Sequence, residues 1–86
     1  MKLDKNKTFP VTVFSPFQTF YDGPAVLVQA SNQSGPFDVL EGHANFLCLL
    51  TPGKLRIHSS AKVEEFSIQK GILQVVNGVT YVFLNI

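Results

Sequence analysis

The fold of this chain is decided by residues 72–84, which read ILQVVNGVTYVFL. Two runs rich in β-branched and aromatic residues, Ile72–Val76 and Val79–Leu84, flank the dipeptide Asn77-Gly78. The tightest turn between antiparallel strands needs φ > 0 at both of its central residues, and Asn followed by Gly meets this need at little cost. The stretch therefore predicts a β-hairpin.

The second strand of this hairpin is apolar on both of its faces. Successive side chains of a strand point to opposite faces, which gives one face Val79, Tyr81 and Phe83 and the other face Val82, Leu84 and Ile86. Both faces must be covered. In a chain of only 86 residues we expect one of them to be a surface that docks on another protein.

The rest of the chain repeats the pattern of short strands and turns. We expect strands at 9–13, 25–30, 37–40, 46–50, 54–58 and 63–69, separated by Gly, Pro, Asn and Ser. Pro10 predicts that the first is an edge strand, and Asp22-Gly23-Pro24 predicts a break before the second. Because no segment has a 3.6-residue apolar repeat with caps, the chain is predicted to be all-β, a sandwich or a small barrel. Residues 1–8 are predicted to be a flexible leader, and residues 9–86 the domain.

Composition and length exclude several classes of protein. With 86 residues and 15% charged residues, against about 25% in an average protein, the chain is too small for a large enzyme and has little charge to cover its 45% apolar content. Its net charge is +1 and it has no basic run, which disfavours nucleic acid as a partner. The single Cys48 excludes an internal disulfide. No apolar run suits a membrane span or a signal peptide, so we expect a cytosolic protein.

Few residues are candidates for chemistry. His43, between Gly42 and Ala44, could be a general base or a metal ligand, but a histidine that bonds the backbone of its loop or meets a partner is the simpler interpretation. His58 is expected to be solvated, and Cys48 to act as a small hydrophobe. The chain has no nucleophile elbow, no phosphate-binding glycine loop and no paired carboxylates. We therefore predict a protein that is not an enzyme, with no catalytic residue, cofactor or metal.

Several short motifs form a familiar series. In chain order they are Ser15-Pro16 ahead of Tyr21-Asp22-Gly23, Ser34-Gly35 ahead of Gly42-His43-Ala44, then Pro52-Gly53-Lys54-Leu55-Arg56-Ile57, Gly71-Ile72-Leu73-Gln74-Val75 and the Asn-Gly hairpin. Their order and spacing resemble the amino-terminal domain of the ATP synthase epsilon subunit over about Phe9 to Leu84. The resemblance implies a flattened sandwich of about ten short strands in two sheets.

The resemblance also implies a function. It implies a rotor subunit at the foot of the central stalk of an F-type ATP synthase, bound to the gamma subunit and resting on the c-ring, which couples proton or sodium translocation to ATP synthesis. Such a subunit is not catalytic, and it is peripheral to the cytoplasmic face of the cell membrane. Family members usually continue into two helices that can inhibit ATP hydrolysis. The sequence stops at Ile86, where those helices would begin, which implies that this chain lacks that route of inhibition.

The resemblance assigns two contact regions. Ser15 and the turn Gly42-His43-Ala44 match positions that lie against gamma, and we expect His43→Ala to weaken gamma binding. The loop Gly35-Pro36-Phe37 matches the loop that faces the c-ring.

This chain departs from the family pattern in both regions. Glu41 and Asn45 replace the two prolines around the histidine, which is expected to make the turn less rigid. Pro36 stands where an acidic residue is common, and this removes a charge from the c-ring loop. We also expect Phe17 and Phe37, which lie in connections between strands, to be partly exposed as docking residues.

Two other classes of function compete with the rotor interpretation. The chain could be an independent β-sandwich module that binds a ligand or acts as an adaptor, or a small hydrolytic or metal-dependent enzyme. The partner separates these possibilities: a rotor subunit needs gamma, a free module needs a ligand of its own, and an enzyme needs activity on a substrate.

Overall fold

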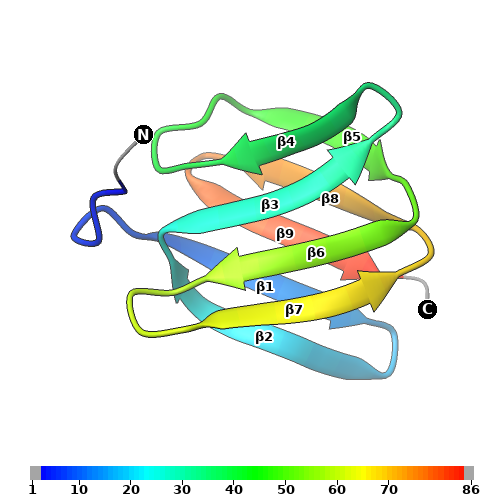
Figure 1. Cartoon of the computed structure of the whole chain (residues 1–86), viewed down its shortest axis with the longest axis horizontal. Helices are drawn as coiled ribbons and strands as arrows, with labels where there is room; N and C mark the ends of the chain where they lie inside the picture. Colours follow the sequence, from blue (N-terminus) through cyan, green and yellow to red (C-terminus); the bar gives the residue numbers. More distant parts are fainter. Residues whose placement is uncertain (1–2, 85–86) are drawn as a thin grey trace.

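The computed structural model describes residues 3–84, which form nine β-strands and no helix (Figure 1). The strands are β1 (Phe9–Ser15), β2 (Gln18–Ala25), β3 (Leu27–Asn32), β4 (Gly35–Val39), β5 (Phe46–Leu50), β6 (Gly53–His58), β7 (Val63–Ile68), β8 (Gly71–Val76) and β9 (Val79–Leu84). Within residues 3–84 there is accordingly no helix that could cross a membrane.

The strands form two sheets that pack face to face. One sheet has five strands in the order β2-β1-β9-β8-β5, and the other has four in the order β4-β3-β6-β7. Figure 1 shows the four-stranded sheet in front of the five-stranded one. All neighbouring strands are antiparallel except β1 and β9, which are parallel. The prediction of an all-β sandwich in two sheets is confirmed, with nine strands in place of about ten.

The core lies between the two sheets and consists of aliphatic side chains and Phe9. Leu55 and Ile57 of β6 are fully buried, as are Leu73 of β8 and Val82 of β9. Burial of one such side chain stabilises the fold by about 1.5–3 kcal/mol, so these inward positions hold the sheets together. The predicted inward face of β7 is also confirmed, because Ile68 is buried and its neighbours on that face are half-buried.

The hairpin at residues 72–84 forms as predicted. Strands β8 and β9 pair antiparallel up to Val76 and Val79, and Asn77 (φ 49°) and Gly78 (φ 84°) make the turn between them. At the other end of the hairpin, a Cβ on Gly71 would lie 2.8 Å from the carbonyl oxygen of Phe83. Only glycine lets the two strands approach this closely at that point.

Two predictions for the first half of the chain are wrong. Strand β1 is not an edge strand, because it lies between β2 and β9. Pro10 is tolerated there because it sits opposite Pro24 on β2 and precedes the residues that pair with β9, which begin at Val11. The stretch Asp22-Gly23-Pro24 is not a break either: it continues β2 as far as Ala25.

Candidate functional site

The outer face of the five-stranded sheet is apolar and largely exposed. Its exposed large apolar side chains are Leu49 (71% exposed), Leu47 (64%), Ile72 (40%) and Tyr81 (40%). Well-folded monomers rarely leave several large apolar side chains together in water, and such clusters commonly mark docking surfaces. This face is therefore the strongest candidate for a functional site.

Cross-strand pairing links several of these side chains, while Leu47 and Tyr81 lie on either side of the exposed Gln74. Leu49 on β5 lies opposite Ile72 on β8, and Ile72 lies opposite Phe83 on β9. The ring of Phe83 in turn contacts that of Phe14 on β1, with 5.4 Å between the ring centroids. We refer to Leu47, Leu49, Ile72, Tyr81, Phe83 and Phe14 as the apolar face; it crosses four adjacent strands of one sheet.

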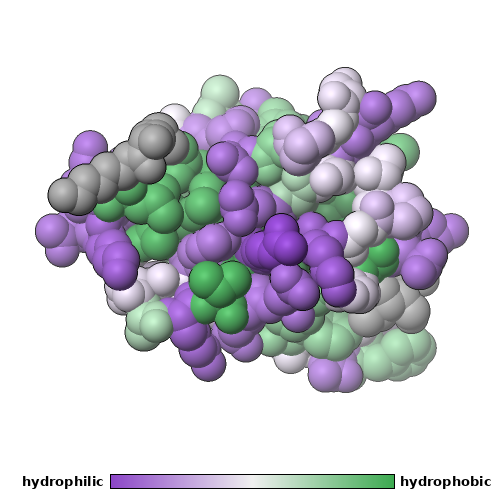
Figure 2. All heavy atoms as spheres, in the orientation of Figure 1, coloured by the Kyte–Doolittle hydropathy of each residue, from purple (hydrophilic) through white to green (hydrophobic). Residues whose placement is uncertain are grey.

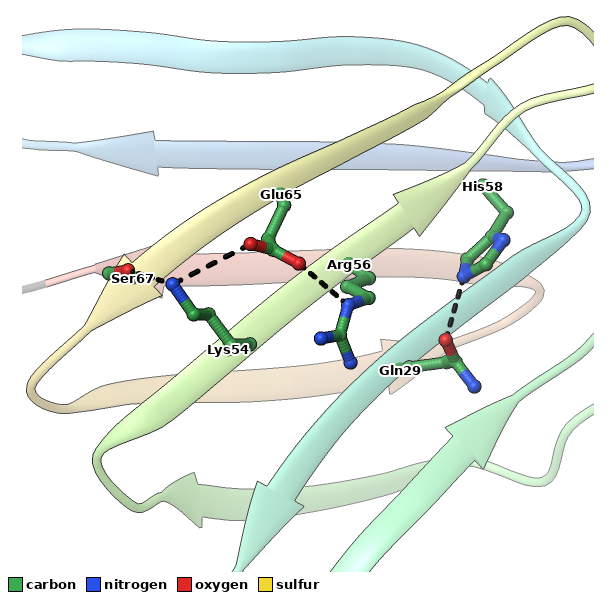
Figure 3. A network of polar contacts seen from close by, with 6 residues as sticks. All are labelled: Gln29, Lys54, Arg56, His58, Glu65 and Ser67. Carbon is green, nitrogen blue, oxygen red and sulfur yellow. Dashed lines mark hydrogen bonds and ion pairs between the residues drawn. The ribbon is translucent and has the colours of Figure 1, made fainter.

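The outer face of the four-stranded sheet has the opposite character. Figure 2 shows hydrophilic residues gathered across its centre, and Figure 3 shows how some of them are connected. Arg56 Nε donates to Glu65 Oε1 (2.8 Å), Lys54 Nζ donates to Ser67 Oγ (2.7 Å), and Lys54 Nζ lies 3.5 Å from Glu65 Oε2. The hydrogen bond from Arg56 holds the pKa of Glu65 below its ordinary value. These groups are exposed and partnered, as expected of a surface that stays in water.

The same polar face also holds His58. Its Nε2 lies 2.7 Å from Gln29 Oε1 on the neighbouring strand, and the side chain is half-buried rather than fully solvated. The large apolar exception on this face is Val63, which is 52% exposed. Val63 is therefore a natural control for experiments on the apolar face.

The structure does not bring together the four residues matched to a gamma contact. Ser15 ends β1, next to the strand end of β9 and the turn that leads to β2. Gly42-His43-Ala44 lies in the loop before β5, and β5 starts opposite Val75, near the β8–β9 turn. Figure 1 shows the β1–β2 turn and the β4–β5 loop at opposite ends of the sandwich. The roles of these residues stay predictions.

His43 is held in place by its own loop and by an aromatic neighbour. Its backbone N–H donates to Leu40 O (3.1 Å), and its ring Nδ1 lies 2.8 Å from Ala44 O, so Nδ1 carries the proton. The imidazole lies 4.6 Å from the ring of Phe46, measured between centroids. This arrangement is that of a histidine that orders its own loop.

Asn45 fastens the same loop to the β8–β9 hairpin. Its Oδ1 accepts a hydrogen bond from the backbone N–H of Asn77 at 2.9 Å. We expected the replacement of a proline by Asn45 to make the turn less rigid, but the side chain of Asn45 supplies a tether that proline cannot form. The loop carrying His43 and the hairpin tip therefore form one connected end of the sandwich.

The residues matched to a c-ring contact start β4 at the other end of the sandwich. The β3–β4 turn is closed by Ser34 N–H, which donates to Asn32 Oδ1 (2.8 Å), and Gly35 follows with φ 116°. Pro36 is exposed, whereas Phe37 is half-buried and meets Phe46 edge to face at 5.9 Å.

Both aromatic side chains predicted to be partly exposed are so. Phe17, in the turn between β1 and β2, is 96% exposed, and Phe37 is half-buried. The expectation that Phe37 lies in a connection is wrong, because it lies within β4 and packs against the core.

Within residues 3–84, no group of three or more His, Cys, Asp and Glu side chains could hold a metal ion. Cys48 packs against the core at half burial, and this burial raises the pKa of its thiol. The apolar face is an extended surface suited to binding.

Sequence reasoning missed Leu47, Leu49 and Ile72 as site residues. The signal was present in the apolar run Phe46–Leu50, which alternates onto both faces of its strand. Without the order of strands in the sheet, that run looks like a buried strand, so its exposed half could not be recognised.

The sequence profile of the ATP synthase delta/epsilon chain β-sandwich domain matches residues 8–85. The chain belongs to this family. An ATP synthase epsilon chain from Chlorobium limicola is 34% identical over 71 residues, which cover 81% of each chain. A similar epsilon chain from Chlorobaculum tepidum is 35% identical over the same share of each chain.

Two solved structures contain a chain with the same fold. A chain of the Euglena gracilis mitochondrial ATP synthase superposes with a TM-score of 0.83 at 20% identity, covering 98% of this chain and 53% of that one. A chain from the central stalk and c-ring of the Tetrahymena thermophila enzyme gives 0.78 at 18% identity, covering 98% and 66%. The epsilon chain 2 of Paraburkholderia xenovorans is 33% identical, and this chain spans 52% of its length. The match to this relative therefore spans about half of the relative's length.

Proposed function

We propose that the chain is the epsilon subunit in the central stalk of an F-type ATP synthase and that its apolar face docks on the gamma subunit. The observation that carries the proposal is the contrast between the two outer surfaces of the sandwich. One sheet presents Leu47, Leu49 and Ile72 to solvent, whereas the other is covered by partnered polar groups. A protein that works alone in water has no use for the first surface, but a subunit that is permanently bound to another does.

The proposed role is mechanical. The subunit turns with gamma and couples ion translocation by the c-ring to ATP synthesis, without bond-making chemistry of its own. Two sheets joined by a fully buried aliphatic core form a stiff body, which suits a part that transmits torque. The location that follows is the cytoplasmic face of the cell membrane, peripheral to it through the complex.

The second proposed contact is with the c-ring, through Gly35, Pro36 and Phe37. Support comes from the position of these residues at one end of the sandwich, where the short β3–β4 turn projects. A subunit that lies against gamma with one sheet can then reach the ring with this end. The half-buried Phe37 stiffens the start of β4 through its contact with Phe46.

The proposal is tested by binding to gamma. The untagged chain should co-purify with a tagged gamma subunit from the same organism and give a one-to-one isotherm with a submicromolar dissociation constant. No complex at roughly 50 µM, a binding free energy weaker than about −6 kcal/mol, would refute the proposal and favour an independent binding module.

A matched pair of variants tests the face. Leu49→Asp places a charge in the apolar face and should weaken gamma binding at least tenfold, about 1.4 kcal/mol. Val63→Asp makes the same kind of change at an exposed apolar residue on the opposite sheet, and it should leave binding unchanged. Equal effects of the two variants would refute the assignment of this face.

A further inference from the structure

The apolar face ends in a hollow beside the turn between β7 and β8. Leu49, Ile72 and Phe83 line it together with Leu50, Lys70 and Gly71, and it encloses about 330 Å³. A second hollow of about 640 Å³ shares Leu49, Leu50 and Lys70 with the first. The two therefore adjoin, and together they extend the apolar face around the end of the sheet.

The charge carried by the lining of these two hollows is positive. Lys70 is the one charged residue among those that line the two hollows, and the remaining lining is apolar or carries uncharged amides and hydroxyls, such as Asn32, Ser34 and Thr51. No carboxylate of residues 3–84 forms an ion pair with Lys70. A fixed positive charge therefore stands at the rim of an apolar hollow with no anion beside it in the described chain.

Three acidic side chains of the described chain are engaged elsewhere. Glu65 is engaged by Arg56 and Lys54 on the opposite sheet. Asp38 lies within reach of Gln29 (3.4 Å), and Asp22 within reach of Thr12 (3.5 Å). Since no ion pair to Lys70 forms within residues 3–84, we assign the complementary anion to a binding partner.

We propose that the partner covers this end of the apolar face with an acidic amphipathic segment, which places an apolar side chain in the hollow of Leu49, Ile72 and Phe83 and a carboxylate on Lys70. The inference rests on the proposed function, and it states the chemistry required of the gamma surface. An apolar side chain alone would fit anywhere on the face, whereas a carboxylate at Lys70 fixes the register and direction of the segment. Charge complementarity of this kind contributes more to specificity and association rate than to raw affinity.

A protein segment fits the observations better than a free small ligand. The hollow is continuous with exposed apolar side chains on β5, β8 and β9. A small amphiphile would fill the hollow and leave most of these side chains in water, whereas a segment of a protein surface covers all of them.

The test is a charge reversal with a matched control. Lys70→Glu and Lys62→Glu both reverse an exposed lysine in a turn, but Lys62 lies in the β6–β7 turn at the other end of the sandwich. Titrated against gamma, Lys70→Glu should weaken binding about tenfold at low salt, and the loss should shrink as salt screens the charges. Lys62→Glu should stay within about twofold of the unmodified chain.

The outcomes separate this inference from the proposed function. Failure of the unmodified chain to bind gamma refutes both. If the unmodified chain binds but Lys70→Glu behaves like Lys62→Glu, the inference is wrong and the proposed function stands. Lys70→Gln, which removes the charge without reversing it, should fall between the two and guards against a folding defect in Lys70→Glu. Lys70-dependent binding of free dodecanoate, with gamma binding unchanged in all variants, would also overturn the inference and make the hollow a small-molecule site.

Discussion

Thr80 is the residue at which one substitution should make the domain more stable. It lies in β9, between Val11 of β1 and Val75 of β8, and its side chain is fully buried. Its Oγ1 has no hydrogen-bond partner within residues 3–84. The fold therefore carries the cost of a buried hydroxyl, and Thr80→Val should remove it.

Two contributions, both of which make the valine variant more stable, set the expected change in the free energy of unfolding. A buried polar group without a partner costs about 1–3 kcal/mol, and valine replaces the hydroxyl by a methyl group in the same shape, which adds about 0.8 kcal/mol of apolar burial. After allowance for imperfect packing of the new methyl group, we expect the free energy of unfolding to rise by about 1–2 kcal/mol. For a domain of this size that corresponds to an increase of about 5 °C or more in Tm.

Thermal and urea unfolding followed by circular dichroism measure this change. Thr12→Val is the control, because Thr12 lies on β1 of the same sheet but is half-buried and its hydroxyl donates to Asp22 Oδ1 at 3.5 Å. We expect the control to leave Tm unchanged or slightly lower. If Thr80→Val lowers Tm or leaves it unchanged, the Thr80 hydroxyl has a partner and the reasoning is refuted. An unchanged urea m-value is required for the comparison to hold.

Two further predictions concern His43 and Glu65. His43→Ala should weaken gamma binding by about 1 kcal/mol or more in a binding isotherm, provided that the imidazole edge left free by Phe46 packs on gamma; an unchanged dissociation constant removes His43 from the interface. Glu65 should titrate below its ordinary pKa in an NMR pH series, and Arg56→Ala should return it toward that value. Because the folded-state pKa is lowered, the stabilisation from this pair is present above the unfolded pKa and is lost as pH falls through the folded pKa. If Glu65 titrates at the same pH in the unmodified chain and in Arg56→Ala, the result contradicts the hydrogen bond between these two side chains.

The fold could be predicted wherever it depends on local geometry. The hairpin at 72–84 needs only the left-handed conformation of Asn77 and Gly78, which neighbouring residues determine. The error at Pro10 has the opposite cause. Whether β1 is an edge strand depends on its parallel pairing with β9, more than 60 residues later in the sequence, and no local pattern specifies such a pairing.

The candidate site was harder to predict for the same reason. The sequence indicated that β9 has two apolar faces, and the outer one does carry Tyr81 and Phe83. It could not indicate that β5 would pair with β8 at the edge of the same sheet and add Leu47 and Leu49 to that surface. Nor could it show that Asn45 would tether its loop to the hairpin, because that contact spans 32 residues.

The most direct measurement is solvent protection of the chain in complex with gamma, by hydroxyl-radical footprinting. We predict that Leu47, Leu49, Ile72 and Tyr81 lose reactivity when gamma is bound, while Val63 on the opposite sheet does not. Protection of Val63, with Leu47 and Leu49 as reactive as in the free chain, would contradict the assignment of the apolar face as the surface that docks on gamma.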